Sequence, residues 1–341
     1  MQLLQTPVRI GSLTLKNRLV MAPMATGRSN DDGTVTDELC AYYAARAKDL
    51  GLIISEHAYI SPEGQASPGQ LSVHSDADIP GLRRLADAVH AADGKIFLQI
   101  SHAGGAAHRE VTGLPALAPS AVSFQGPKAN GIVMTPETPA DLCPRPFTEE
   151  ELRQLVQHFA DAARRAKKAG FDGVEIHSAH AYLLDQFYSP LLNHRDDAYG
   201  GTLENRVRIH LEIIEAVRAA VGADYPVALR LGASDYAPGG ATIEDGVAAA
   251  KLFAAAGIDL IDISGGTCSY TRPGHRDSGT FADASQAVRE AVSIPVLTAG
   301  GVKTGEAAEA LLQSGVADLI GIGRSLIADA DWATKALTSL R

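Results

Sequence analysis

The chain has 341 residues, of which 45% are hydrophobic, and its formal net charge is -10. The acidic balance argues against binding to nucleic acid or anionic membranes, and no stretch approaches the roughly 20 apolar residues of a membrane span. The three cysteines, Cys40, Cys143 and Cys268, lie far apart in no metal-binding spacing, so no metal site is expected. The first residues lack the apolar core of a signal peptide, and we therefore expect a reduced, cytoplasmic protein.

The N-terminal residues predict a small β-hairpin, because Val8–Ile10 and Leu13–Lys16 alternate apolar and polar side chains around a Gly-Ser turn. After it, a short apolar run, a loop and an amphipathic stretch follow one another eight times. The apolar runs predict strands at Leu19–Met24, Leu52–Ala58, Ile96–Ile100, Gly173–His177, Val227–Leu231, Leu260–Ile263, Val296–Ala299 and Leu319–Ile322. The amphipathic stretches predict helices at Glu38–Leu50, Ile79–Asp93, Glu149–Ala169, Leu203–Val221, Ile243–Ala256, Ala284–Ala291, Glu306–Ser314 and from Leu326 onward.

Residues with known preferences for helix ends stand at several of these boundaries. Thr148 and Glu151 form a capping box at the start of the helix predicted from residue 149. Gly170, Gly257 and Gly315 lie just past predicted helices, where a left-handed residue commonly ends the helix.

Eight strand–helix units with nearly continuous apolar strands indicate a parallel sheet covered on both faces, and eight units close a (β/α)8 barrel. An open doubly wound sheet is the alternative, but MAPMATG stands after the first strand in place of a GxGxxG loop. We predict a single (β/α)8 TIM barrel over residues 1–341, capped by the N-terminal hairpin. Residues 104–147 are predicted to form a long excursion over the barrel mouth, since loops of that length usually carry function.

Two glycine-containing loops predict a phosphate site. In barrels of this kind, functional residues gather at the C-terminal ends of the strands. Gly300 and Gly301 follow the seventh predicted strand, and Gly323 and Arg324 follow the eighth. Backbone amides after these two strands bind phosphate in many barrels, and an arginine adds a charged donor. The glycines could instead only make tight turns, but their coincidence at both strand ends favours a phosphate-bearing cofactor.

Two further strand ends suggest where the reactive ring of such a cofactor would lie. Arg230 ends the fifth predicted strand, where a buried cation would stabilise negative charge on a reduced flavin. Gln99 ends the third and offers both a donor and an acceptor to a pyrimidine-like ring edge. The alternatives are a structural ion pair for Arg230 and no special role for Gln99.

The stretch FDGVEIHSAHAY places His177, His180 and Tyr182 at and just beyond the end of the fourth predicted strand. Two imidazoles and a phenol at one spot suit carbonyl chemistry, because they can donate hydrogen bonds and a proton. Taken singly, each has another interpretation: a core histidine, a loop hydrogen bond, part of a zinc site, or a packed tyrosine. The other histidines, His57 among them, are interpreted as structural or surface residues, apart from His102, which lies near the end of the third predicted strand.

Several longer segments resemble one known family. LKNRLVMAPMATG, GLIISEHAYISPEG, LQISHAGG, HSAHAYLLDQFYSPLLNHR and LIGIGRSLIAD are similar to the Old Yellow Enzyme family of FMN-dependent ene-reductases, in its bacterial branch with a His-x-x-His pair. The resemblance implies FMN contacts from Ala22, Pro23, Met24, Ala25, Ala58, Gln99, Arg230, Gly300, Gly301, Gly323 and Arg324. It also implies that His177 and His180 hold the substrate oxygen and that Tyr182 donates the proton. Many relatives carry Cys or Thr in place of Ala25, and Thr26 is a candidate substitute.

The activity that the resemblance implies is reduction, by NADH or NADPH, of a C=C bond conjugated to a carbonyl or nitro group in a small-molecule substrate. Other flavin activities stay open, namely nitro reduction, reductive demethylation and a dienoyl-CoA-like reaction. A non-redox barrel that binds a sugar phosphate and a flavin-binding protein without catalysis are the further alternatives. No lysine stands at a strand end, which disfavours Schiff-base chemistry. The resemblance also implies a homo-oligomer, a dimer or a tetramer, in which Arg341 could reach a neighbour's active site.

Overall fold

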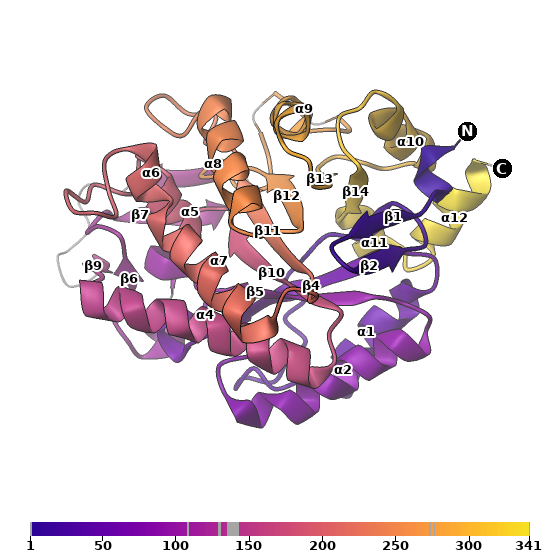
Figure 1. Ribbon diagram of the computed structural model, residues 1–341. Helices are drawn as coiled ribbons and strands as arrows, with labels where there is room; N and C mark the ends of the chain where they lie inside the picture. The colour runs from indigo at the N-terminus through magenta and orange to yellow at the C-terminus, as the bar shows by residue number, and fades with distance from the viewer. Residues whose placement is uncertain are drawn as a thin grey trace.

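The computed structural model of the protein describes residues 2–107, 109–128, 131–134, 143–272, 274–275 and 277–340, with the backbone alone at 125–128 and 131–134. Its centre consists of β3 (Leu19–Met21), β4 (Leu52–Tyr59), β5 (Ile96–Ser101), β10 (Gly173–Ser178), β11 (Val227–Gly232), β12 (Leu260–Ser264), β13 (Val296–Ala299) and β14 (Leu319–Ile322). These strands are parallel and close into a barrel in the order β10-β11-β12-β13-β14-β3-β4-β5 (Figure 1). The predicted TIM barrel is confirmed.

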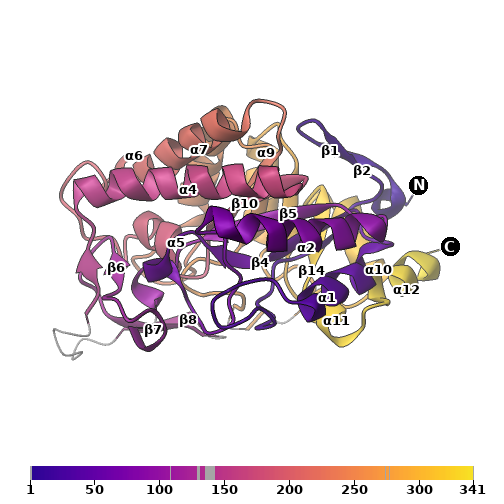
Figure 2. The same cartoon turned by 90° about the horizontal axis from the view of Figure 1, so that it is seen from below.

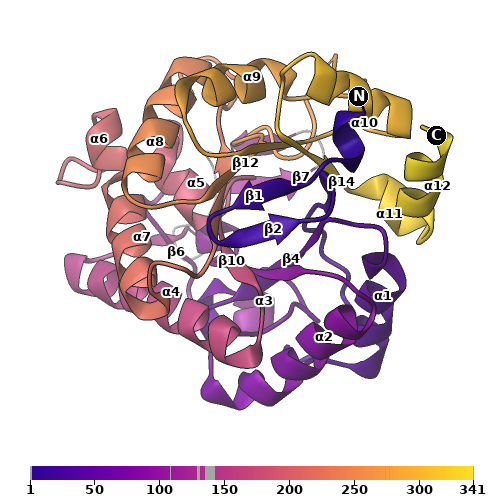
Figure 3. The same cartoon turned by 45° about the vertical axis from the view of Figure 1, so that its right-hand side comes forward.

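Helices surround the barrel as a ring (Figure 3). They are α1 (Asp37–Ala47), α2 (Ile79–Ala91), α4 (Glu149–Ala169), α5 (Leu183–Tyr188), α6 (Leu203–Arg206), α7 (Arg208–Val221), α8 (Ile243–Ala255), α9 (Ala282–Ala291), α10 (Gly305–Gln313), α11 (Arg324–Ala328) and α12 (Trp332–Ser339). Within the described ranges, none of the helices combines the length and the apolar character that crossing a membrane requires.

The ends of α4 follow from local sequence. The Thr148 hydroxyl accepts from the amide of Glu151, whose carboxylate accepts from the amide of Thr148, so the predicted capping box is confirmed. Gly170 ends the helix with φ 94°, in the left-handed region. Gly257 and Gly315 are also left-handed, with φ 106° and 76°, as their positions predicted.

Several element bounds differ from the prediction, and the helix predicted from Leu326 onward is two helices, α11 and α12. Three further differences are informative. β3 ends at Met21 instead of continuing to residue 24, and Pro23 lacks the N–H that would extend the ladder. The helix predicted over residues 203–221 breaks at Val207, where the buried Arg206 side chain donates to the carbonyl of Tyr188. The short helix α5 was not predicted, because all of its residues are buried and leave no amphipathic period to detect.

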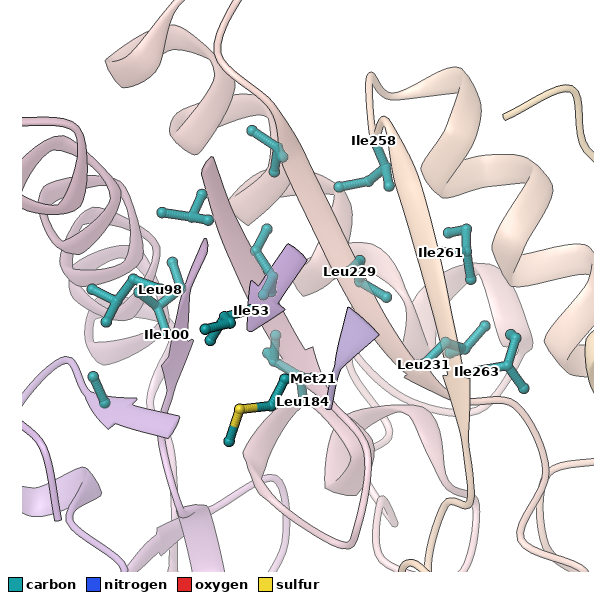
Figure 4. Packing of buried hydrophobic residues seen from close by; sticks show 14 of the residues in the cluster. Met21, Ile53, Leu98, Ile100, Leu184, Leu229, Leu231, Ile258, Ile261 and Ile263 are labelled. Carbon is teal, nitrogen blue, oxygen red and sulfur yellow. The ribbon is translucent and has the colours of Figure 1, made fainter. Parts of the chain in front are cut away.

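Apolar side chains form two separate cores. The larger lies between the strands and the helices, and Figure 4 shows some of its members, including Met21, Ile53, Leu98, Leu229 and Ile261. The smaller fills the barrel interior and contains Ile10, Leu15, Val20, Leu52, Ile54, Phe97, Ala228, Leu260, Leu297 and Leu319. Strands that bury both faces explain why their sequences are continuously apolar.

The N-terminal hairpin closes one end of the barrel. β1 (Val8–Ile10) and β2 (Leu13–Leu15) pair antiparallel, and Figure 3 shows them in the centre of the ring of helices. Ile10 and Leu15 belong to the interior cluster together with residues that begin their strands, such as Leu260. The hairpin therefore caps the N-terminal end, as predicted, and leaves the C-terminal strand ends for the site.

The segment 104–147 carries short elements of its own. They are η4 (Gly104–Ala106), α3 (Arg109–Thr112), β6 (Leu117–Ala118), β7 (Phe124–Lys128), β8 (Gly131–Met134) and β9 (Arg145–Pro146). β6 pairs with β9 and β7 with β8, and Figures 1 and 2 place these strands at the end of the molecule opposite the β1–β2 hairpin. Residues 108, 129–130 and 135–142 lie outside the described residues. The described part of the excursion thus lies toward the mouth of the barrel.

Candidate active site

A layer of polar side chains continues the apolar interior of the barrel. Gln99 of β5 stands beside Glu175 of β10, and Arg230 of β11 stands beside Asp262 of β12. All four are at most 4% exposed. Phe97, two residues before Gln99, belongs to the apolar interior cluster, so strand alternation places both side chains on the same inner face.

The hydrogen-bonding capacity of this polar layer is only partly used by the chain. Gln99 Nε2 donates to Oε1 of Glu175 at 2.8 Å, and Arg230 Nε lies 3.4 Å from Asp262 Oδ2. Nε and Nη1 of Arg230 form no hydrogen bond with any described residue. Burial raises the pKa of Glu175 well above its ordinary value and that of Asp262 to about 6. A buried guanidinium with unused N–H groups calls for an acceptor from outside the chain.

The three residues predicted as one chemical group, His177, His180 and Tyr182, do lie together. The two imidazole centroids are 5.4 Å apart with the rings edge to face, and the phenol ring lies 5.1 Å from His177. His177 is level with Arg230 in the β10–β11 register and is 4% exposed. Nε2 of His180 contacts Oγ of Ser264, at the end of β12, at 2.7 Å. His177 therefore lies level with the polar layer, and His180 and Tyr182 lie beyond it at the mouth of the barrel.

A strained turn after β10 aims these rings. His180 and Ala181 both have positive φ, 62° and 58°, which non-glycine residues rarely adopt. The carboxyl group of Asp185 accepts a hydrogen bond from the amide of Ala181 at 2.7 Å. Gln186 Nε2 donates to the carbonyl of the same Ala181 at 2.6 Å. Both partners are fully buried on α5. The helix that the sequence did not predict thus stabilises the turn that carries His180 and Tyr182.

The imidazoles are uncharged near neutral pH. Burial, reinforced by the positive charge of Arg230, lowers the pKa of His177 and of His180 well below the ordinary value. Burial also raises the pKa of Tyr182 to about 12, so this phenol keeps its proton. In the described part of the chain, no group of three or more His, Cys, Asp or Glu side chains is placed to hold a metal ion. The site therefore offers neutral N–H donors and one protonated phenol.

At the ends of β3 and β4, Thr26 turns toward a buried carboxyl group. Its hydroxyl donates to Oε2 of Glu56 at 2.5 Å, and the Tyr43 hydroxyl donates to the same oxygen at 3.3 Å. Burial raises the pKa of Glu56 to about 7. Ala25, which precedes Thr26, is exposed. The Thr26 hydroxyl is therefore engaged with β4, and sequence reasoning did not anticipate Glu56 as its partner.

His57, interpreted from its sequence position as a structural or surface residue, also lies in the site. Its ring centroid is 5.1 Å from that of Tyr182 and 6.1 Å from that of His177. The β4 register shifts between Ile54 and His57, so the inward positions change from even to odd numbers. The side chain of Ala58 packs into the outer core, and its predicted cofactor contact stays a prediction. The position of His57 at a strand end could have indicated a place in the site. Regular strand alternation counted from Ile54, however, would have turned its side chain outward.

The segment after β3 that was predicted to contact the cofactor lies beside the last strand. The amide of Ala22 donates to the carbonyl of Ile322 at 3.0 Å. A Cβ placed on Gly323 would lie 3.2 Å from Sδ of Met24. Ala22, Pro23 and Met24 are thereby gathered with Gly323 on one side of the mouth.

The loop after β13 needs glycine, and the loop after β14 supplies a cation. Gly300 and Gly301 have φ 134° and 73°, and a Cβ on Gly301 would lie 2.2 Å from the carbonyl oxygen of Asp277. Arg324 is exposed and forms no ion pair with any described residue. Glycine is therefore required here by the packing of the loop against residues 277–280, and the phosphate site stays a prediction to which the exposed Arg324 would add a charged donor.

These residues fit flavin mononucleotide, which carries a phosphate and a pyrimidine-like ring edge. Gly300, Gly301 and Gly323 with Arg324 would hold the phosphate. Arg230, whose unused N–H groups are the observation behind this fit, would face the ring edge together with Gln99.

A closed parallel barrel with buried polar side chains and glycine loops at the C-terminal ends of its strands is an arrangement typical of cofactor-dependent barrel proteins. The chain belongs to the NADH:flavin oxidoreductase / NADH oxidase family, whose model matches residues 3–341. FMN is the flavin of this family.

Three similar proteins illustrate this membership. An NADH oxidase of Thermoanaerobacter brockii is 41% identical over 337 residues, which cover 96% of this chain and 50% of that protein. The chain thus spans about half the length of this relative. An NADPH dehydrogenase of Bacillus subtilis is 39% identical over 341 residues, 98% of this chain and 94% of the relative. A solved old yellow enzyme homologue from Zymomonas mobilis matches with a TM-score of 0.84 at 34% identity, covering 99% of this chain and 93% of that one. The resemblance to the Old Yellow Enzyme family is confirmed.

Proposed function

We propose that this protein uses FMN and NAD(P)H to reduce activated C=C bonds of α,β-unsaturated carbonyl or nitro compounds. The observation that carries the proposal is the pair of neutral imidazoles, His177 and His180, with the phenol of Tyr182 beside them. Membership of the flavin oxidoreductase family and similarity to an NADPH dehydrogenase support the choice of electron donor.

The imidazole pair suits an oxygen that gains negative charge during the reaction. When hydride reaches the β-carbon, the substrate oxygen becomes enolate-like, and each N–H donor to it strengthens. One such donor typically contributes about 10²–10³ in rate. Because burial keeps both imidazoles uncharged, they stabilise the developing charge as hydrogen-bond donors and do not transfer a proton to the oxygen as imidazolium ions would.

Tyr182 is the proton donor in this proposal. Its O–H bond breaks as a new C–H bond forms at the α-carbon, and a phenolate remains. A pKa of about 12 keeps the proton on the phenol until the α-carbon carries negative charge. Its ring centroid lies 5.1 Å from that of His177, one of the two imidazoles that hold the substrate oxygen in this proposal.

The chemistry that FMN supplies when bound is hydride transfer, from NAD(P)H and then to the alkene. The chain holds the phosphate through Gly300, Gly301 and Arg324 and meets the ring edge with Arg230. The carboxyl group of Glu175 accepts a hydrogen bond that orients Gln99, and that of Asp262 lies 3.4 Å from Arg230 Nε.

The test is a titration of the purified, FMN-loaded protein with p-hydroxybenzaldehyde, followed by visible absorption spectroscopy. A phenolate held between His177 and His180 over the flavin should give a long-wavelength charge-transfer band, which His177→Ala should weaken. His158→Ala, on α4 outside the barrel, is the matched control and should keep the band. NADPH consumption with 2-cyclohexenone and with β-nitrostyrene then measures turnover. A protein that stays colourless after FMN is added contradicts the cofactor, and a yellow protein without the band contradicts the role of the imidazole pair.

The homo-oligomer expected from the family resemblance stays a prediction. Arg341 lies outside the described residues. Size-exclusion chromatography with light scattering gives the subunit number. Arg341→Ala should lower turnover only if the protein is an oligomer in which this residue reaches a neighbouring site.

A further inference from the structure

His57 occupies a place in the mouth that the proposed chemistry has not yet used. The residue is 8% exposed, and its ring centroid lies 5.1 Å from that of Tyr182, the same separation as between Tyr182 and His177. The bulge in β4 turns it inward, so its position is a property of the strand and not of a mobile loop.

The side chain of Gln70 determines which nitrogen of His57 carries the proton. Gln70 Oε1 accepts from the amide of Ala66 at 2.6 Å, which fixes the orientation of the carboxamide. Its Nε2 must then be the group that contacts His57, and it lies 3.2 Å from both Nδ1 and the carbonyl oxygen of that residue. Because an N–H group donates to Nδ1, this nitrogen is the acceptor and the ring proton is on Nε2.

The Nε2–H group of His57 is available for another partner. Burial lowers the pKa of this imidazole to about 4, so the ring is neutral and keeps its proton on Nε2 near neutral pH. Nε2 forms no hydrogen bond with any described residue, since the contacts of this ring are those of Nδ1 with Gln70. A neutral histidine whose acceptor nitrogen is occupied presents only a donor to its surroundings.

Tyr182 is the neighbour that needs such a donor. In the proposed reaction its hydroxyl loses a proton and becomes an anion in a buried setting, where an unpaired charge is costly. The titratable groups around it are His57, His177 and Tyr270. His177 is committed to the substrate oxygen, and Tyr270 raises the pKa of Tyr182 instead of stabilising the anion. His57 is the remaining N–H donor in this set.

We propose that His57 is a positioning residue: when proton transfer leaves a phenolate on Tyr182, the unused Nε2–H of His57 donates a hydrogen bond to that oxygen and stabilises the anion. The Tyr182 O–H bond breaks, a C–H bond forms on the substrate, and solvent water afterwards returns a proton to the phenolate. The kinetic consequence rests on the proposed function, whereas the hydrogen bond itself does not. Gln70 acts through His57, because its contact with Nδ1 keeps the proton of that ring on Nε2.

The first test titrates Tyr182 in the FMN-loaded protein by NMR of ¹³Cζ-labelled tyrosine, with Tyr182→Phe to assign the signal. His57→Leu keeps the bulk of the ring but removes the donor, while His57→Gln keeps an N–H group at the position of Nε2. A hydrogen bond to a charged group changes an acid constant by about tenfold or more, so His57→Leu should raise the pKa of Tyr182 by about one unit. His57→Gln should restore most of that shift. An unchanged pKa in His57→Leu, or equal shifts in both variants, overturns the proposal.

A second measurement connects the hydrogen bond to turnover. In single-turnover reoxidation of the reduced protein by 2-cyclohexenone, His57→Leu should slow the reaction about tenfold in the wild-type background. The effect should vanish in the Tyr182→Phe background, because a donor to a missing phenolate has nothing to stabilise. An equal effect in both backgrounds indicates a merely structural role. If the wild type does not reduce the enone at all, the proposed function fails, and the NMR titration still decides the His57–Tyr182 contact.

Discussion

The two ends of the barrel interior are built from the same strands and have opposite chemistry. Toward the hairpin, Phe97, Ala228 and Leu260 belong to one apolar cluster with Ile10 and Leu15. Two residues further along the same strands, Gln99, Arg230 and Asp262 form the polar layer. The apolar cluster requires no hydrogen-bond partner, whereas the mouth holds buried nitrogens and oxygens without partners among the described residues.

This contrast separates stability from chemistry within one barrel. Apolar packing lowers the free energy of the fold without demanding any ligand. Unsatisfied buried donors such as those of Arg230 cost stability unless a ligand completes them. We therefore expect substitutions at the hairpin end to change unfolding, and substitutions at the mouth to change binding and turnover.

The largest expected effect is at the hairpin end. Phe97→Ala removes a fully buried ring and should lower the free energy of unfolding by about 3–5 kcal/mol. Urea denaturation measures the loss, and turnover per folded, FMN-containing molecule should stay close to that of the wild type. A stable variant with impaired turnover would contradict the separation of the two ends.

The counterpart at the mouth is His177→Ala. Loss of one donor to the developing negative charge should lower kcat for 2-cyclohexenone by about 10²–10³, or about 3–4 kcal/mol in the activation barrier. Stopped-flow kinetics measures this, and urea denaturation of the same variant should show a much smaller change than Phe97→Ala. Unaltered turnover would remove His177 from the mechanism.

Glu56, at the mouth, distinguishes the two ends further, because its titration should make the free energy of unfolding depend on pH. Its pKa in the folded protein is about 7 against an ordinary 4.5, so its stabilising contribution is complete below pH 4.5 and is lost as the pH rises through 7. Relative to Glu56→Gln, the wild type should therefore lose up to about 3 kcal/mol of unfolding free energy between those pH values. Denaturant titrations at pH 4.5 and pH 8, with equal FMN saturation, measure the difference. Parallel pH curves for both proteins would contradict the raised pKa.

The smallest effects are expected at the two ends of α4, outside the barrel interior. Thr148→Ala removes the N-cap at the mouth end and should cost about 1 kcal/mol of stability. Gly170→Ala forces a side chain into φ 94° at the other end and should cost about the same. Thermal denaturation measures both losses. A fall in turnover per folded molecule in either variant would show that the helix contributes to the site.

The sequence predicted those features of the structure that are set by residues close together in the chain. The eight strands, the cap of α4 and the glycine helix ends follow from apolar runs, a Thr-x-x-Glu pattern and Gly170, all of which act within a few residues. The grouping of His177, His180 and Tyr182 was predicted because these residues are close neighbours in the chain. α5 was missed because its burial depends on distant partners.

By itself, the sequence determined the barrel, the hairpin that caps it and the grouping of His177, His180 and Tyr182, since periodicity and short spacing carry that information. Only the tertiary structure decided which side chains of β4 face inward, because a bulge reversed the alternation and brought His57 to Tyr182. The same holds for the Thr26–Glu56 pair and for the tautomer of His57, which is held by Gln70. Such contacts join residues on separate segments, and a one-residue shift in strand register is enough to make or remove them.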